Sequence, residues 1–252
     1  MVRRGDGDAI ERALRGVAPG RYEAYEELLR ALGEGDVWML LWYGEAGRPD
    51  AQYGNMEVGR FGYAPCVTSA EQLAASGWPR AHQVSPGREI AASLYRERWG
   101  LWLNPHQSGG GVGVPWADLR RVAGGLDRLP AGPLRIDEPA VPAEGFYAAL
   151  AQAAQGTPAV RSLRRGWVWP ALGEPYLVIG LDLYEAGPAA VESVRLMMEQ
   201  ALPSAPEGVD VSTVAMSDPY DSVALWLRVR AVPFFDREGA APPAYGYPQP
   251  LR

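Results

Sequence analysis

The chain has 252 residues, of which 47% are hydrophobic and 21% charged, and its formal net charge is −6. This composition is typical of a globular protein with one large core or two small ones. The acidic balance argues against nucleic acid as the main partner, because a duplex-binding surface needs a basic face. The longest apolar run, residues 37–43, is too short to cross a bilayer, and no apolar segment follows the N-terminal arginines as in a signal peptide. We therefore expect a cytoplasmic protein without a membrane partner.

Two residue counts exclude further chemistry. All 24 basic residues are arginine, so the chain has no lysine for a Schiff base, for general-base catalysis or for a P-loop. Cys66 is the single cysteine, so no disulfide can form within the chain.

In the first half, hydrophobic periodicity predicts helices that alternate with strands. Apolar residues recur at helical spacing over 21–35, and the run at 36–44 is typical of a buried strand. A turn-rich loop is expected at 44–56. The other predicted elements are helices at 8–17, 68–77, 85–98 and 115–125 and strands at 57–67, 82–84 and 100–104.

Two of these helices carry capping signals. Thr68 or Ser69 is expected at the N-cap of one, with Glu71 placed to complete a capping box with Thr68. Ser85 is expected to cap the next, with Pro86 as its first residue.

Residues 124–142 contain four prolines and three glycines and are predicted to form a linker without helix or ladder. The predicted fold class is α+β, with two small mixed sheet-and-helix domains at 1–123 and 143–238 joined by this Pro/Gly-rich linker. A Pro/Gly/Ala-rich tail, 239–252, is expected to be disordered. The second domain should contain helices at 143–155, 187–202 and 220–231 and strands at 159–169, 175–184 and 208–216.

The glycine-rich stretch between Asn104 and Pro115 superficially resembles a phosphate-binding loop. It lacks the GK[ST] signature, and Pro115 has no N–H where an anion-binding helix start would offer one. We interpret the stretch as a strand end at Asn104-Pro105, a mobile loop and a helix start at Pro115.

The same stretch indicates a family. "LWLNP" followed by "VPWADL" resembles the SseB family, the enhanced-serine-sensitivity proteins. Downstream, "GEPYLVIGLDL" and "APEGVDVSTV" resemble the C-terminal SseB domain. The chain departs from the family at Cys66-Val67, where an aromatic is usual, and in "HQSGGGVGV", which replaces a shorter loop. The resemblance spans residues 20–236 and implies two small α+β domains, often without established biochemistry. Upstream, the matching positions are Thr68, Ser69, Glu71, Leu73, Pro86, Gly87 and Arg88.

Cys66, His82 and His106 are candidates for a nucleophile and its base, but their spacing is not that of a zinc site or a known catalytic motif. We interpret them as a small buried thiol and two surface or loop imidazoles.

Acidic and basic clusters also have structural interpretations. Carboxylates near the end of the second domain could hold Mg²⁺ or Ca²⁺, but Asp218 is better explained as the cap of a helix that begins at Pro219. The arginines of "RSLRRG" suit an anion or, more simply, a solvated strand end. No catalytic, cofactor-binding or metal-binding residue is predicted, and no G-x-S-x-G elbow is present. The residues weighed here are Asp182, Asp210, Asp218, Asp221, Arg161, Arg164 and Arg165.

Nine tryptophans are many for two small cores, and tryptophan is enriched where proteins meet. We therefore expect a non-enzymatic protein of the SseB type that binds another protein through an aromatic surface and the glycine-rich loop, with a homodimer left open. The alternatives are a chaperone-like or immunity-like module for a secreted partner and an unrecognised hydrolase or transferase. The predicted protein-binding residues are Trp102, Asn104, Pro105, His106, Gly110 and Trp116.

Overall fold

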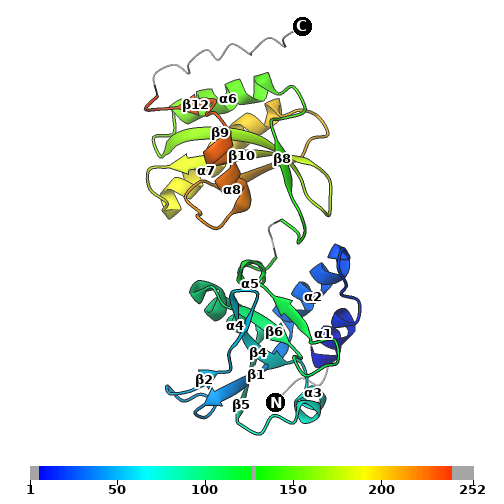
Figure 1. Ribbon diagram of the computed structural model, residues 1–252. Coiled ribbons are helices and arrows are strands. Elements are labelled where there is room, and N and C mark those ends of the chain that lie inside the picture. Colours follow the sequence, from blue (N-terminus) through cyan, green and yellow to red (C-terminus); the bar gives the residue numbers. More distant parts are fainter. Residues whose placement is uncertain (1–5, 127–128, 240–252) are drawn as a thin grey trace. The chain divides into compact units, whose positions relative to one another are not determined.

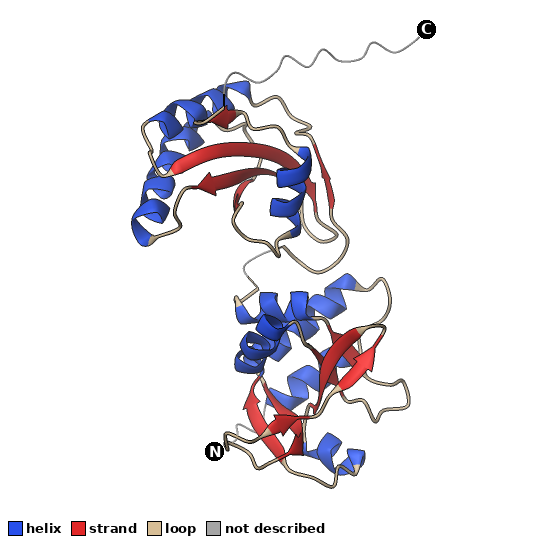
Figure 2. Ribbon diagram, turned by 60° about the vertical axis from the view of Figure 1, so that its left-hand side comes forward, coloured by secondary structure: helices blue, strands red, loops and turns tan. Residues whose placement is uncertain are grey.

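The computed structural model describes residues 6–126 and 129–239 (Figure 1). The chain divides between Pro133 and Leu134 into two compact units. Each unit combines helices with a mixed sheet, as Figure 2 shows, which confirms the predicted α+β fold in two parts. The division falls inside the segment expected to be a linker.

In unit 1, the strands form one sheet in the order β2-β1-β4-β6-β7, with β5 paired to the other edge of β1 and β3 paired to β4. β4 and β6 are parallel, and the other pairs are antiparallel. The helices are α1 (Asp6–Leu14), α2 (Tyr22–Glu34), α3 (Ala70–Ser76), α4 (Gly87–Leu94) and α5 (Trp116–Ala123). The strands are β1 (Asp36–Tyr43), β2 (Gln52–Tyr53), β3 (Met56–Val58), β4 (Phe61–Val67), β5 (His82–Pro86), β6 (Gly100–Leu103) and β7 (Val112–Val114).

The core of unit 1 lies on one face of this sheet. Alternate residues of β1 and β4, such as Met39 and Cys66, point into a cluster formed by α1, α2, α4 and α5. Leu28 and Leu32 of α2 are fully buried in the same cluster.

A largely buried ion pair, Glu26–Arg121, connects α2 with α5 and with the segment at Ala131. Glu26 accepts hydrogen bonds from Arg121 at 2.8 and 2.9 Å and from the backbone N–H of Ala131 at 2.9 Å. Residues 124–133 therefore belong to unit 1, because Ala131 is buried in its core.

One predicted cap in unit 1 is confirmed, and one predicted helix start is wrong. Ser69 alone caps α3, accepting from the N–H of Gln72, because Thr68 bonds elsewhere. The helix expected at Ser85 begins at Gly87, since Ser85 and Pro86 pair with β1. Tertiary pairing thus outweighs the local capping signal, and a Cβ at Gly87 would overlap the carbonyl oxygen of Leu32.

The glycine-rich loop, expected to be mobile, is largely a β-hairpin. Val112–Val114 pair with Leu101–Leu103 as strands β7 and β6. Gly113 permits this because a Cβ there would lie 2.6 Å from the Trp102 ring.

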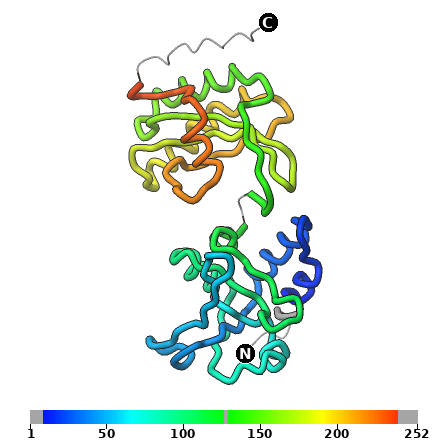
Figure 3. The backbone as a smooth tube through the Cα atoms, in the orientation of Figure 1, coloured from blue at the N-terminus to red at the C-terminus, as the bar shows by residue number. Residues whose placement is uncertain are grey.

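Unit 2 has a sheet in the order β11-β10-β9-β12, with β8 also paired to β9; Figure 3 traces its chain. β10 and β11 are parallel. The helices are α6 (Glu144–Gln155), α7 (Pro188–Ala201) and α8 (Ser222–Arg230). The strands are β8 (Arg135–Asp137), β9 (Val160–Trp169), β10 (Tyr176–Leu183), β11 (Val211–Ala215) and β12 (Phe235–Asp236).

The long elements of unit 2 agree with the sequence prediction, and the short ones do not. β8 lies within the segment expected to lack a ladder, and β12 was not predicted. Helix α8 is capped by Asp221, which accepts from two backbone N–H groups, rather than by Asp218. The tail expected to be disordered lies, apart from Gly239, outside the described residues.

Candidate functional site

Asn104 joins two of the sequence stretches that carried the family resemblance in the first half of the chain. It is fully buried and adopts a left-handed backbone with φ of 50°. Its Oδ1 accepts from the Thr68 N–H at 3.1 Å, and its Nδ2 donates to Thr68 Oγ1 at 2.8 Å and to Glu11 Oε1 at 2.9 Å. The Thr68 hydroxyl also bonds to Glu11. Asn104 therefore holds α1 to the ends of β4 and β6, and the prediction that it contacts a partner disagrees with its burial.

His106 extends this network toward α3. Its Nε2 lies 2.9 Å from Gln72 Oε1, and Gln72 Nε2 donates to Glu11 at 3.3 Å. His106 Nδ1 is buried without a partner among the described residues. Pro105 and His106 are both half-buried, so the start of the loop is pinned to α1 and α3.

Trp102 and Gly110 meet across the hairpin. The Trp102 indole N–H donates to the Gly110 carbonyl at 2.6 Å, and its ring packs edge-on against Tyr63 with centroids 5.0 Å apart. Trp116 begins α5, which packs on the opposite face of the sheet. The six predicted residues are therefore not one surface: Trp102 and Gly110 lie together, and Asn104 and Trp116 belong elsewhere.

The structure adds a surface that the sequence did not reveal: the face of the unit 1 sheet that points away from the core helices. We call it the aromatic face. Strand alternation and the pairing registers place mostly apolar or aromatic side chains on it, together with His82 and, at the start of β1, Asp36. Trp42 and Phe61 on this face are 54% and 57% exposed, and Val58 and Val84 are also exposed. Four further members of the face are buried: Leu40, Tyr63, Pro65 and Val67. Its residues are Asp36, Trp38, Leu40, Trp42, Met56, Val58, Phe61, Tyr63, Pro65, Val67, His82, Val84 and Trp102.

Trp42 sits on a β-bulge at one end of this face. Leu41 pairs with Tyr53 but Tyr43 pairs with Gln52, so Trp42 is the extra residue of β1. A bulge bends a strand and redirects the side chain it carries.

Two neighbours frame the exposed Trp42 ring. The Trp78 ring lies 6.3 Å away, inclined by 44°, and the Arg80 guanidinium carbon lies 4.4 Å from the Trp42 ring centroid. Arg80 also donates to the Trp42 carbonyl. We call Trp42, Trp78 and Arg80 the tryptophan slot.

The Cys/His candidates are not assembled into a nucleophilic site. Cys66 is fully buried on the core face, and burial raises the pKa of its thiol, which disfavours the reactive thiolate. His82 lies on the opposite face of the sheet, paired with Leu40, and His106 is bonded to Gln72.

The acidic candidates have structural partners. Asp221 caps α8 at 2.9 and 3.0 Å, Asp218 accepts from the Tyr220 N–H at 3.0 Å, and Asp182 accepts from Arg161. Within residues 6–126 and 129–239, no group of three or more His, Cys, Asp or Glu residues is placed to hold a metal ion.

The three arginines of β9 are likewise engaged. Arg161 donates to Asp182 at 2.9 and 2.6 Å, and Arg164 donates to the Ala231 carbonyl. Arg165 lies over the Tyr147 ring at 4.5 Å. These contacts explain the cluster as part of the fold of unit 2.

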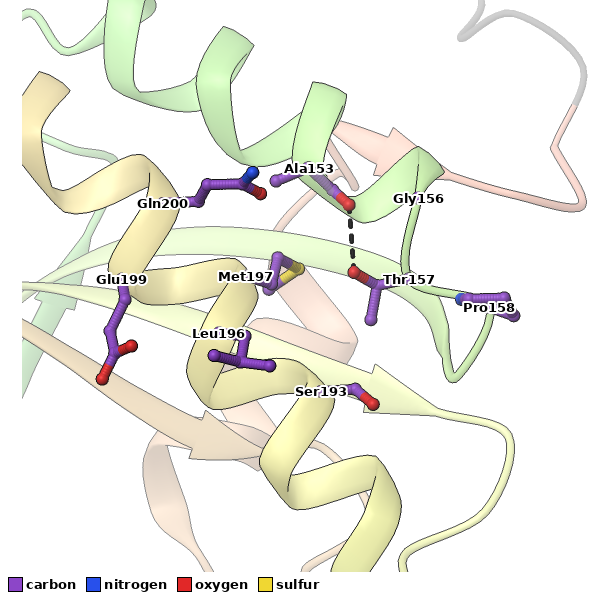
Figure 4. Close-up of a pocket in the computed structure, with 9 residues that line it drawn as sticks. All are labelled: Ala153, Gly156, Thr157, Pro158, Ser193, Leu196, Met197, Glu199 and Gln200. Carbon is purple, nitrogen blue, oxygen red and sulfur yellow. Dashed lines mark hydrogen bonds between the residues drawn. The ribbon is translucent and has the colours of Figure 1, made fainter.

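A hollow of about 710 Å³ lies between α6 and α7 in unit 2 (Figure 4). Three of its four polar side chains have partners within the protein: Thr157 bonds to the Ala153 carbonyl, Ser193 to the Ala189 carbonyl, and Glu199 to Arg195. Gln200 is the fourth. It therefore offers no set of converging free polar groups to a ligand.

The comparisons with known proteins bear on unit 2. Residues 129–237, which include every element from β8 to β12, match the family model described as the SseB protein C-terminal domain. No curated protein and no solved structure matches the chain significantly. Among the described residues, no helix has both the length and the apolarity that crossing a membrane requires.

Proposed function

The chain belongs to the SseB family, and from that premise we propose that it is a non-enzymatic, cytoplasmic accessory protein that binds another protein through the aromatic face of unit 1. The observation that carries the proposal is the contrast between the two faces of one sheet. One face is closed by α1, α2, α4 and α5, while the other presents tryptophan, phenylalanine and valine side chains to solvent. Exposed apolar side chains such as Trp42, Phe61 and Val84 are typical of interaction sites, and tryptophan is enriched at their energetic centres.

Hydrogen bonds within the free protein order the segment 102–110 at the edge of the aromatic face. The Trp102–Gly110 hydrogen bond closes the hairpin at one end, and the Asn104 network holds the start of the loop. A surface that is already ordered loses less conformational entropy on binding. The glycine-rich hairpin therefore forms an ordered edge of the aromatic face.

The hydrolase or transferase alternative has less support. A cysteine nucleophile must be accessible and ionised, and Cys66 is neither. The hollow between α6 and α7 is lined by neither histidine, nor by Asp210 or Asp218. Nucleic acid and membranes are not the proposed partners, since a formal net charge of −6 disfavours association with polyanionic surfaces.

The test is capture of a partner from a lysate of the native host by immobilised full-length protein, followed by binding measurements with that purified partner. We expect Trp42→Ser combined with Phe61→Ser to weaken binding by at least about 2 kcal/mol, since both rings are exposed on the proposed interface. Val229→Ser is the matched control, because Val229 is 70% exposed on α8 of unit 2. Equal affinity of all three proteins for the partner would reject the aromatic face as the interface.

A further inference from the structure

Strand β11 lies at one edge of the unit 2 sheet, where β10 is its only paired neighbour among the described residues. Two bonds at the ends of this parallel ladder show which peptide groups of β11 face β10. The Leu177 N–H donates to the Asp210 carbonyl, and the Met216 N–H donates to the Leu181 carbonyl, each at 2.9 Å. Peptide groups alternate in direction along a strand, so residues 210, 212, 214 and 216 bond to β10 and residues 211, 213 and 215 face the open edge.

The open edge of β11 has unused hydrogen-bonding groups. Over residues 6–126 and 129–239, the N–H and carbonyl groups of Val211 and Thr213 that face this edge have no partner, and the Ala215 carbonyl accepts only from the Asp218 N–H. The strand Val211–Ala215 contains no charged residue and no proline, which are the residues that usually protect an edge from pairing with another chain. Thr213 is exposed, so its side chain leaves this edge accessible.

The sequence of β11 is suited to antiparallel pairing with a second copy of itself. A two-fold axis at Thr213 places Thr213 opposite Thr213 and Val211 opposite Ala215, so every residue that faces the edge meets another that does so. Asp210, the nearest charged residue, is then opposite Met216 of the other copy and not opposite a second carboxylate. The pairing therefore satisfies the open backbone groups without opposing like charges.

Helix α7 carries an apolar stripe beside the same edge. Val191 and Leu202 are 62% and 44% exposed, and with the partly buried Met198 they share one side of the helix. The opposite side of α7, with Ser193 and Leu196, faces the hollow toward α6.

The position of α6 shows which way this stripe points. Tyr147 of α6 packs against Phe234, which directly precedes β12, with ring centroids 5.2 Å apart. Helix α6 therefore lies toward the β12 edge of the sheet. The side of α7 that faces away from α6 lies toward the β11 edge, so its stripe would flank a second copy paired there.

We propose that two copies of this protein pair antiparallel through β11 about a two-fold axis at Thr213, which makes one continuous sheet of the two unit 2 sheets and brings the two α7 stripes beside each other. The inference concerns unit 2 and does not depend on the aromatic face. About ten residues a side would be covered, fewer than the 20–30 or so of a standard interface, so we expect a weak dimer with a Kd on the order of 10–100 µM.

Sedimentation equilibrium of the full-length chain between about 5 and 500 µM tests the dimer, because this range brackets the expected Kd. Thr213→Glu and Thr213→Arg each place two like charges opposite each other at the axis, and each should weaken the dimer about fivefold. An equal mixture of the two variants pairs opposite charges and should associate within about twofold of the natural chain. A variant that had lost its fold would not recover on mixing. Gln152→Glu and Gln152→Arg, at an exposed position of α6, are the matched controls and should leave the Kd unchanged.

Disulfide trapping tests the register. Hydrogen-bonded antiparallel partners have Cα atoms about 5.5 Å apart, a distance that a disulfide can span. Under mild oxidation Thr213→Cys should form a disulfide-linked dimer at least about tenfold faster than Gln152→Cys, since only a paired edge holds the two thiols together. The natural Cys66 is fully buried and does not contribute.

The proposal is overturned if the natural chain stays monomeric at about 500 µM, well above the expected Kd. It is also overturned if both charged variants dimerise as well as the natural chain, if their mixture does not recover, or if the two cysteine variants crosslink at equal rates. A monomeric chain whose captured partner is lost in Thr213→Glu would show that the edge binds a foreign strand instead of a second copy. Dimerisation that depends on Trp42 and Phe61 but not on Thr213 would place the contact on the aromatic face, and this inference would again fail. Partner capture that depends on Trp42 and Phe61 supports the proposed function whichever way the dimer test falls.

Discussion

Asn104 and Thr68, 36 positions apart, hold each other through paired hydrogen bonds at the ends of two neighbouring parallel strands. The two residues come from two of the short stretches of the first half that suggested the family. Their partner Glu11 lies on α1, so one buried polar cluster joins three distant parts of unit 1. The hydrogen bonds of this cluster give Thr68 and Asn104 a structural role, which is to connect α1 with the ends of β4 and β6.

Replacing Asn104 should destabilise unit 1. Asn104→Ala leaves the Thr68 N–H without its partner, removes one of the hydrogen bonds to Glu11 and places alanine in a left-handed conformation, so we expect the free energy of unfolding to fall by about 2–4 kcal/mol. Asn104→Gly removes the hydrogen bonds but tolerates the backbone, and should lose about 1 kcal/mol less. Urea denaturation measures both, with the exposed Gln107→Ala as control. A change below 1 kcal/mol for Asn104→Ala would contradict the role assigned to this residue.

Gly113 should be intolerant of any side chain. A Cβ at this position meets the Trp102 ring, so Gly113→Ala must displace the ring and weaken its bond to Gly110, at a cost of about 1–3 kcal/mol. Gly109→Ala is the matched control, since nothing lies within 4 Å of its added Cβ. Thermal unfolding and near-UV circular dichroism of the two variants should differ clearly, and equal melting temperatures would show that the hairpin does not need glycine here.

The Glu26–Arg121 pair should be sensitive to the loss of either member. Glu26→Ala leaves the largely buried guanidinium of Arg121 with Asp118, 3.7 Å away, as its remaining carboxylate, and we expect unit 1 to lose about 2–3 kcal/mol. Glu27→Ala, one position along on the exposed side of α2, should change stability by less than about 0.5 kcal/mol. Chemical denaturation of both variants checks the contrast. If Glu26→Ala unfolds no more easily than Glu27→Ala, the buried pair does not anchor the segment at Ala131.

Alkaline pH should reveal the buried tyrosines. Burial, with the negative charge of Asp221, raises the pKa of Tyr176 to about 12, and burial also raises the pKa values of Tyr25, Tyr53 and Tyr147. The folded state thus keeps a Tyr176 proton that the unfolded state, with a pKa near 10, releases. The stabilising contribution is complete below about pH 10 and is lost as pH rises toward 12.

Spectrophotometric titration should therefore show these tyrosines ionising after the exposed ones. Tyr176→Phe should remove one late-ionising group and flatten the fall of unfolding free energy with pH in this range. A single uniform titration near pH 10 in the folded protein would contradict the burial of these side chains.

The long elements of this fold could be predicted from sequence because each contains its own periodic signal. Helix α7 and strand β10 agree with the predicted ranges to within two residues at each end. The short strands β8 and β12 have no such signal and exist only because β9 offers them a pairing edge. The helix expected to begin at Pro86 starts one residue later for the same reason, since pairing with β1 extends β5 through Pro86.

The candidate surface was only partly predictable. Alternation along β1 correctly placed Trp38 and Trp42 on one face, and the exposure of tryptophan near the glycine-rich stretch was expected. Which face of the sheet the helices cover depends on contacts between distant segments, and no local pattern encodes it. Arg80 and Trp78 were missed because their role arises from a β-bulge that follows no sequence signal.

The complete burial of Cys66 gives unit 1 a chemical reporter of its own. A thiol reagent can reach the only sulfhydryl of the chain only when the sheet separates from α2 and α4, so the labelling rate records opening events of that unit. Unit 2, which has no cysteine, is silent in the same experiment. Local unfolding of unit 1 can thus be measured separately from that of unit 2 in the intact protein, through the labelling rate of Cys66.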